Sequence, residues 1–189
     1  SKQGAITIAP GSMSVGQGLE TSFPDIVAGE LKISADRIKY IQGDTDYLPS
    51  GRGSGGSAAT ITGGSAVING AEILIQTGNQ IAADVLKCNI SDIQYNNGNF
   101  YHMNDPDTAL DWSEIAQYSN QPDGLDIMGE FTPSAPTYPN GCHICEVEID
   151  TSTGKCYVQD YVAVEDVGTA LYPVLIEGQI LGDIVQGIS

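Results

Sequence analysis

Three clusters of glycine with glutamine or serine contain the residues of this sequence that could bind a polar ligand. They are Gly16-Gln17-Gly18, Gly53-Ser54-Gly55-Gly56-Ser57 and Gly178-Gln179. Glycines let a backbone approach a ligand closely, and backbone N–H groups and carboxamides bind anionic groups without a charged side chain. The chain carries 24 acidic and 7 basic residues, a formal net charge of -17. Such neutral donors would therefore have to hold any anionic ligand.

Each cluster, taken alone, also fits an ordinary structural role. Gly53 to Ser57 precedes a helical pattern, so Ser57 is the expected N-cap and the first N–H groups of the helix would face the loop. A nucleotide-binding P-loop would carry a lysine directly after its glycines, whereas here Arg52 precedes them. Gly16 to Gly18 fits a tight turn, and Gln179 fits an ordinary helical glutamine.

The negative charge disfavours two classes of partner. Nucleic acids and anionic membranes would both be repelled by a chain of this charge. No segment approaches the roughly 20 apolar residues that a membrane span requires, and the first residues lack the apolar region of a signal peptide. We therefore expect no nucleic-acid partner, no membrane span and a cytoplasmic location.

The four cysteines do not have the spacing of a metal site. Cys142 and Cys145 lie in an alternating strand pattern, where residues three apart point to opposite faces. Cys88 and Cys156 form no second pair with zinc-ligand spacing. We expect free thiols in a reducing compartment and assign no residue to a metal.

Helical and strand patterns alternate along the chain and predict an α+β fold, with helices packed on small mixed or antiparallel sheets. Asn96-Asn97-Gly98-Asn99 predicts a tight hairpin turn, and Asp111 or Ser113 is the expected cap of a short helix. The expected strands are 5–9, 38–42, 93–95, 100–102, 125–131, 142–150 and 155–166, and the expected helices contain 23–31, 57–87, 115–118 and 174–188. Within the helix 57–87, the residues expected to form a buried stripe are Ile61, Val67, Ala71, Leu74, Ile81, Ala82 and Leu86.

Prolines 133, 136 and 139 lie in a segment, 132–139, that would join two halves of one domain. The halves would be 1–131 and 140–189 within a domain covering 1–189. The chain stops inside an apolar periodic run at Gly187-Ile188-Ser189, without a helix C-cap signal. We expect it to be a fragment of a longer protein.

Several motifs occur together in one order and closely resemble the molybdenum-binding large subunit of the xanthine dehydrogenase, aldehyde oxidase and aerobic carbon monoxide dehydrogenase family. The resemblance runs from about Ile6 to Ile188. The motifs are Val15 to Thr21, Gly43 to Asp46 with Pro49, Gly53 to Ser57, Gly64 to Ala66, Cys145 to Asp150, Glu165 to Gly168, and Pro173 with Glu177 to Gln179.

The resemblance implies a molybdopterin cofactor, in its mononucleotide or cytosine dinucleotide form, with the metal ligated by the cofactor's own sulfurs. It also implies iron–sulfur and flavin (FAD) domains or subunits as partners, beside the remaining parts of the large subunit and a small-molecule substrate. Neutral amides match the donor and acceptor edges of a pterin. By this resemblance the cofactor contacts are Gly16, Gln17, Gly18, Gly55, Gly56, Ser57 and Gln179.

Two family motifs are absent from the chain. The Phe-Gly-Gly segment that carries a glutamine beside the metal, and the Gly-x-Gly-Glu motif that carries the base, do not occur. We therefore assign no catalytic residue and expect no turnover from these 189 residues alone. Two alternatives are an acidic module that binds calcium near Asp44-Thr45-Asp46 and a nucleotide-binding α+β domain that uses the Gly53 loop.

Overall fold

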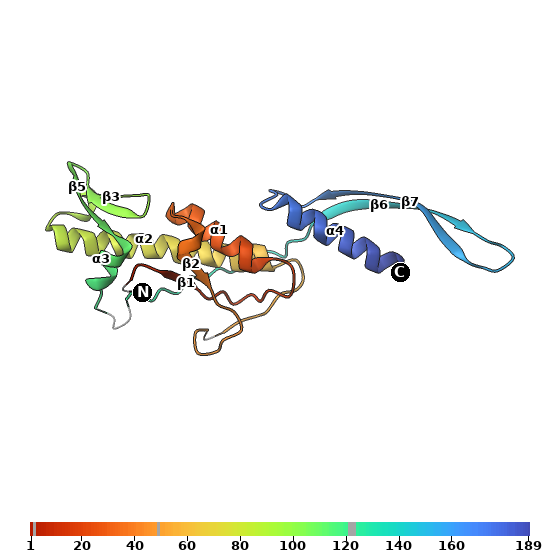
Figure 1. Cartoon of the computed structure of the whole chain (residues 1–189), viewed down its shortest axis with the longest axis horizontal. Coiled ribbons are helices and arrows are strands. Elements are labelled where there is room, and N and C mark those ends of the chain that lie inside the picture. The colour runs from red at the N-terminus through yellow and green to blue at the C-terminus, as the bar shows by residue number, and fades with distance from the viewer. Residues whose placement is uncertain (2, 49, 121–123) are drawn as a thin grey trace. The chain divides into compact units, whose positions relative to one another are not determined.

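The computed structural model describes residues 1, 3–48, 50–120 and 124–189, and they form two compact units, Ser1–Ala135 and Pro136–Ser189 (Figure 1). Helices and small sheets make up both units, which confirms the α+β class. The helices are α1 (Leu19–Leu31), α2 (Ser65–Leu86), α3 (Trp112–Gln117) and α4 (Pro173–Ile188). The strands are β1 (Ile6–Ile8), β2 (Ile38–Tyr40), β3 (Ile93–Asn96), β4 (Asn99–His102), β5 (Asp105–Asp111), β6 (Asn140–Ile149) and β7 (Cys156–Asp166).

The first unit begins with a parallel pair of strands, β1 and β2, in which Ile6 lies opposite Ile38. A parallel pair needs a crossover connection, and α1 supplies it. The helix packs against β2 and α2, and its Phe23 and Leu31 are completely buried. Both strands were expected, as was the helix, whose apolar residues have helical spacing, and the structure confirms all three.

The helix expected from Ser57 begins later than the sequence indicates. A π-helical segment, Ala59–Gly64, precedes α2, whose N-cap is Gly64. Ser57 is therefore not the N-cap: its φ of 54° and that of Gly56, 59°, are left-handed, so the chain turns there before any helix forms. The π segment also alters the helical phase, and Ile61, expected in the buried stripe, is 40% exposed.

A three-stranded antiparallel sheet, β3-β4-β5, packs on the other end of α2. Its first turn has the expected geometry, with φ of 49° at Asn97 and 78° at Gly98. Strand β5 was not expected, because its acidic sequence has no apolar alternation. The rings of Phe100 and Trp112 pack edge to face with their centroids 4.7 Å apart, and Phe100 is fully buried.

The short helix α3 begins with a capping box. The Asp111 carboxylate accepts the N–H groups of Ser113 at 2.8 Å and Glu114 at 2.9 Å, and the Glu114 side chain accepts the N–H of Asp111 at 2.9 Å. Of the two expected caps, the structure selects Asp111. The hydrogen bond from the Ser113 hydroxyl is the main cause that lowers the pKa of Asp111.

The strand expected at 125–131 does not form. This segment instead lies along α2, where the Glu130 N–H donates to Asn69 Oδ1 at 3.1 Å. The close approach depends on glycine, because a Cβ at Gly129 would lie 2.3 Å from the Ala66 carbonyl oxygen. The segment packs on a helix and pairs with no described strand, so its alternating apolar residues do not make a ladder.

The second unit is a long antiparallel hairpin, β6 and β7, with α4 following it. The hairpin was expected, and the structure confirms it. Its turn is held by Asp150, whose carboxylate accepts the Ser152 and Thr153 hydroxyls, and these bonds lower the Asp150 pKa to about 2. The boundary between the two units, between Ala135 and Pro136, falls within the 132–139 segment.

Glycine 78 gives a test of how tightly α2 packs on β4. A Cβ at Gly78 would lie 2.3 Å from Cζ of the buried Phe100. We expect Gly78→Ala to lower the free energy of unfolding by about 1–3 kcal/mol despite the better helix propensity of alanine. Urea unfolding followed by the fluorescence of Trp112 measures this change.

The matched control for this test is Gly29 on α1. It is exposed, and a Cβ there would meet no described atom within 4 Å. Gly29→Ala should raise the free energy of unfolding by about 0.4–1 kcal/mol. Equal effects of the two substitutions would contradict the contact between Gly78 and Phe100.

The Asp111 cap predicts a dependence on pH. Asp111→Ala should reduce the free energy of unfolding at pH 7 by about 1 kcal/mol, whereas Asp111→Asn should preserve it. Because the folded pKa of Asp111 lies below its ordinary value of 3.8, the contribution is present above that value and is lost as pH falls through the folded pKa. Urea unfolding at several pH values should show this loss in the parent and not in Asp111→Asn.

Candidate functional site

Two glycine-rich loops of the first unit lie side by side. The first glycine loop, residues 9–18, joins β1 to α1, and the second glycine loop, residues 50–58, leads into the π segment. The Gly11 carbonyl oxygen accepts the N–H groups of Arg52 at 3.0 Å and Gly53 at 3.2 Å. These bonds bring together two of the three glycine clusters singled out in the sequence.

The carbonyl oxygen of Met13 is the point where the side chains of both loops meet. It accepts Nε2 of Gln17 at 3.1 Å, and it also accepts the Ser54 hydroxyl from the second loop. Gln17 of the first loop and Ser54 of the second therefore bind the same main-chain oxygen. Sequence reasoning had not singled out Met13 or given Ser54 a role of its own, because contacts across 41 residues leave no local pattern.

Gln17 is already partly bonded within its own loop. Its Oε1 accepts the N–H of Val15 at 2.6 Å while its Nε2 donates to Met13. A carboxamide has two acceptor positions and two N–H donors, so one of each stays available for a ligand. These two bonds fix the direction in which the remaining acceptor position and the remaining N–H of Gln17 point.

The glycines of the two loops divide into packed and open positions. A Cβ at Gly51 would lie 3.0 Å from the Gly11 carbonyl oxygen, so this glycine permits the approach of the loops. At Gly16, Gly55 and Gly56 an added Cβ would meet no atom of the described chain within 4 Å. Backbone at these open positions is accessible to a ligand.

Gly18 differs from the other expected contact residues. It is buried and forms the N-cap of α1 with a left-handed φ of 79°. Its observed role is to turn the chain from the first glycine loop into the helix.

Main-chain N–H groups of the second loop form its donor set. Ala58 donates to the Gly55 carbonyl oxygen at 3.3 Å, which closes a turn. Among the described residues, no acceptor is found for the N–H groups of Gly55, Gly56 and Ser57. Consecutive free N–H groups ahead of a helical segment can bind an anionic group.

The remaining expected contact residue, Gln179, belongs to the second unit. It lies on α4 with its side chain exposed, next to Gly178. Gly178 is another open position, since a Cβ there would meet no described atom within 4 Å.

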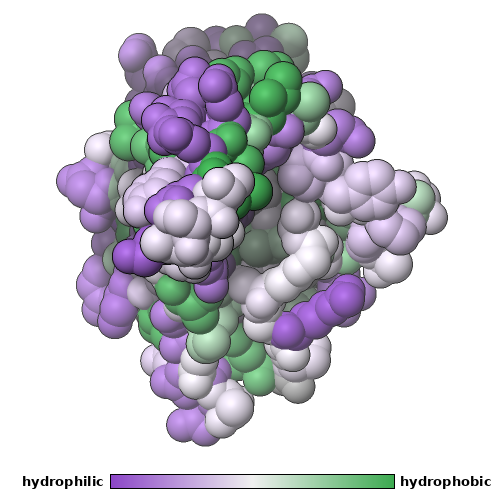
Figure 2. Space-filling model, turned by 90° about the vertical axis from the view of Figure 1, so that its right-hand side faces the viewer, coloured by the Kyte–Doolittle hydropathy of each residue, from purple (hydrophilic) through white to green (hydrophobic). Residues whose placement is uncertain are grey.

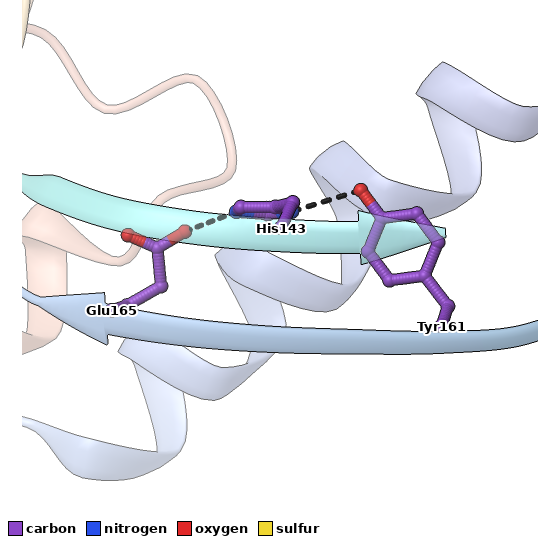
Figure 3. A network of polar contacts seen from close by, with 3 residues as sticks. All are labelled: His143, Tyr161 and Glu165. Atoms are coloured by element: carbon purple, nitrogen blue, oxygen red, sulfur yellow. Dashed lines mark hydrogen bonds and ion pairs between the residues drawn. The ribbon is translucent and has the colours of Figure 1, made fainter. Parts of the chain in front are cut away.

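The second unit also contains a polar network that the sequence reasoning missed. Nδ1 of His143 lies 2.8 Å from the Tyr161 hydroxyl, and Nε2 of the same ring contacts the Glu165 carboxylate (Figure 3). A neutral imidazole satisfies both partners when the tyrosine donates to Nδ1 and Nε2–H donates to Glu165. The network ties β6 to β7 near the open end of the hairpin.

The described residues contain no helix long and apolar enough to cross a membrane, and no group of three histidine, cysteine or acidic residues placed to hold a metal ion. The four cysteines are free thiols, and Cys88 is the one that is half-buried.

Comparison with known proteins identifies the family of the chain. The family model for the molybdopterin cofactor-binding domain matches residues 1–189. The chain therefore belongs to the molybdopterin cofactor-binding domain family. This finding confirms the resemblance derived from the glycine clusters and the motifs around them.

Individual relatives show the same relationship. The carbon monoxide dehydrogenase large chain of Afipia carboxidovorans is 32% identical over 98% of this chain and 24% of its own length. The 6-hydroxypseudooxynicotine dehydrogenase complex subunit gamma of Paenarthrobacter nicotinovorans is 30% identical over 100% of this chain and 25% of its own length. A crystal structure of the Cu,Mo-CO dehydrogenase has a TM-score of 0.77 and 32% identity, covering 96% of this chain and 24% of that chain. The chain thus spans about a quarter of the length of these relatives.

Proposed function

We propose that this chain is the part of a molybdenum hydroxylase large subunit that holds the molybdopterin cofactor on its two glycine loops. The observation that carries the proposal is the meeting of the loops at the Met13 carbonyl oxygen, with open backbone on both sides. Family membership supports the ligand class.

The donor set of the loops fits the cofactor. A pterin presents alternating donors and acceptors, and its side chain ends in phosphate. The spare acceptor and N–H of Gln17 suit the pterin edge, and the N–H groups of Gly55, Gly56 and Ser57 suit phosphate. On a chain with a net charge of -17, this donor set holds an anion without adding a basic cluster.

Each expected contact residue has a role in the proposal. Gly16 lets the backbone approach the cofactor closely, and Gly18 sets the turn that presents Gln17. For Gln179, which lies on α4 of the second unit, the proposed cofactor contact rests on the family resemblance alone. The mononucleotide and the cytosine dinucleotide forms of the cofactor are both compatible with this set.

The chemistry follows from the class of cofactor. When bound, the molybdenum group supplies the oxidation of a C–H bond or of carbon monoxide, with water as the source of oxygen. The residues of this chain bind and orient that group, and none of them is assigned a catalytic role. The longer protein would supply the glutamine and glutamate motifs that are absent here.

The substrate of the longer protein is a separate question. The two curated relatives are named for carbon monoxide and for 6-hydroxypseudooxynicotine, although both match nearly the whole of this chain. The shared part therefore fits a role in holding the cofactor, and we propose that residues outside it select among aldehydes, purines, N-heterocycles and carbon monoxide.

Partners of the chain are proposed on the same basis. The exposed apolar residues of α4 include Val174 (80% exposed), Leu181 (55%) and Val185 (62%). Apolar side chains also appear between polar ones on the face in Figure 2. We propose that remaining parts of the large subunit cover α4. Iron–sulfur and flavin domains or subunits would accept the electrons. We also propose that the protein is cytoplasmic, in keeping with its free thiols.

The sharpest test replaces an open glycine whose conformation any residue can adopt. Gly55 has no left-handed φ, and a Cβ there meets no described atom within 4 Å. In the longer protein that contains this chain, Gly55→Leu should leave the melting temperature of cofactor-free protein unchanged but lower the molybdenum and pterin content at least about tenfold. Metal analysis and the fluorescence of the released pterin measure this loss.

The matched control is Gly29→Leu, which adds the same side chain at an open, exposed position on α1. It should leave the cofactor content at the parent level. Normal cofactor content in Gly55→Leu would refute the placement of the cofactor at the second glycine loop.

A further inference from the structure

One glutamine outside both glycine loops makes two hydrogen bonds to the first of them. Gln42 lies two residues after β2, and its Oε1 accepts the N–H of Ser14 at 2.8 Å while its Nε2 donates to the Ser14 carbonyl oxygen at 3.2 Å. A single carboxamide thus pairs with both main-chain groups of one residue, as a neighbouring strand would. The contact joins residues 28 positions apart.

A tyrosine fixes the orientation of this carboxamide. The Tyr40 hydroxyl donates to the same Oε1 of Gln42 at 3.1 Å. A tyrosine hydroxyl is protonated at neutral pH and can donate, and burial, with the negative charge of Glu20 nearby, raises the pKa of Tyr40 further. The oxygen of Gln42 is thereby directed to the Ser14 N–H and its nitrogen to the Ser14 carbonyl.

The residue held by Gln42 is central to the first glycine loop. Ser14 follows Met13, whose carbonyl oxygen accepts from Gln17 and from Ser54. The Ser14 hydroxyl also donates to the Glu20 carboxylate in the first turn of α1, and this bond is the main cause that lowers the Glu20 pKa. Fixing Ser14 therefore fixes the carbonyl where the loops meet and the start of the helix.

A loop of this composition needs such a support. Gly16 has a φ of 112° with open space around it, and Val15 is 70% exposed, so local packing restrains this part of the chain little. If only the ordered loop binds a ligand, the apparent affinity falls with the fraction of molecules in which the loop is ordered. Ordering the loop before binding removes that loss.

We propose that Gln42 is a positioning residue that holds the first glycine loop in its cofactor-binding conformation before the cofactor arrives, an inference that rests on the function proposed above. Gln42 acts through Ser14 and Met13 and needs no contact with the cofactor. Its side chain is neutral, which adds no further charge beside Glu20.

The first experiment measures the loop without any cofactor. In the longer protein, purified from cells that make no molybdopterin, Gln42→Leu should raise the amide hydrogen exchange of residues 12–18 about tenfold, the factor expected from losing one or two net hydrogen bonds. Exchange in α2 and the melting temperature should stay at parent values. Tyr40→Phe, which removes only the orienting hydroxyl, should give a smaller increase in the same segment.

The second experiment measures cofactor loading of the same variants in cells that make molybdopterin. Molybdenum and pterin content per chain should fall in Gln42→Leu and fall less in Tyr40→Phe. The matched control is Gln76→Leu, an exposed glutamine of α2. It should change neither exchange in 12–18 nor cofactor content.

The outcomes separate this inference from the proposed function. Unchanged exchange in cofactor-free Gln42→Leu would overturn the inference, and so would faster exchange with normal cofactor content. If Gln42→Leu keeps the cofactor while Gly55→Leu loses it, the inference fails and the proposed function stands. If both variants keep the cofactor, the proposed function itself fails.

Discussion

The structure of the candidate site depends on hydrogen bonds to two main-chain carbonyl oxygens, those of Gly11 and Met13. Gly11 receives the N–H groups of Arg52 and Gly53, and Met13 receives the side chains of Gln17 and Ser54. These bonds hold together two loops that the sequence separates by a helix and a strand. Because the chain is strongly acidic, a ligand site made of main-chain and carboxamide groups avoids concentrating basic side chains at one place.

Glycine serves two opposite purposes in this fold. Gly51, Gly78 and Gly129 are packed, and an added Cβ at any of them would lie 3.0 Å or less from another atom. Gly16 and Gly55 are open. The packed glycines bring segments together, and the open ones leave backbone free for a ligand. A sequence cannot separate the two kinds, because the difference lies in atoms contributed by distant residues.

The sequence predicted those elements whose cause is local. The Asn97-Gly98 turn and the Asp111 cap depend on neighbours within four positions, and both occur as expected. The prediction of Ser57 as an N-cap was wrong because the chain turns through left-handed residues there, and a π segment precedes α2. The prediction of a strand at 125–131 was wrong because the main chain of this segment contacts a helix, as the hydrogen bond from the Glu130 N–H to Asn69 shows.

The sequence by itself determined the α+β class, the family resemblance and the residue types available to a cofactor, since these follow from local spacing and from the order of motifs. Which residues support one another was decided by tertiary structure. Gln42 lies against Ser14 because β2 pairs in parallel with β1 and brings the ends of both strands to one edge. Ser54 lies against Met13 where the second glycine loop is bonded to the Gly11 carbonyl oxygen. Hydrogen bonds across 28 and 41 residues have no signature in local sequence, because any exposed glutamine or serine could make them and the fold alone selects which one does.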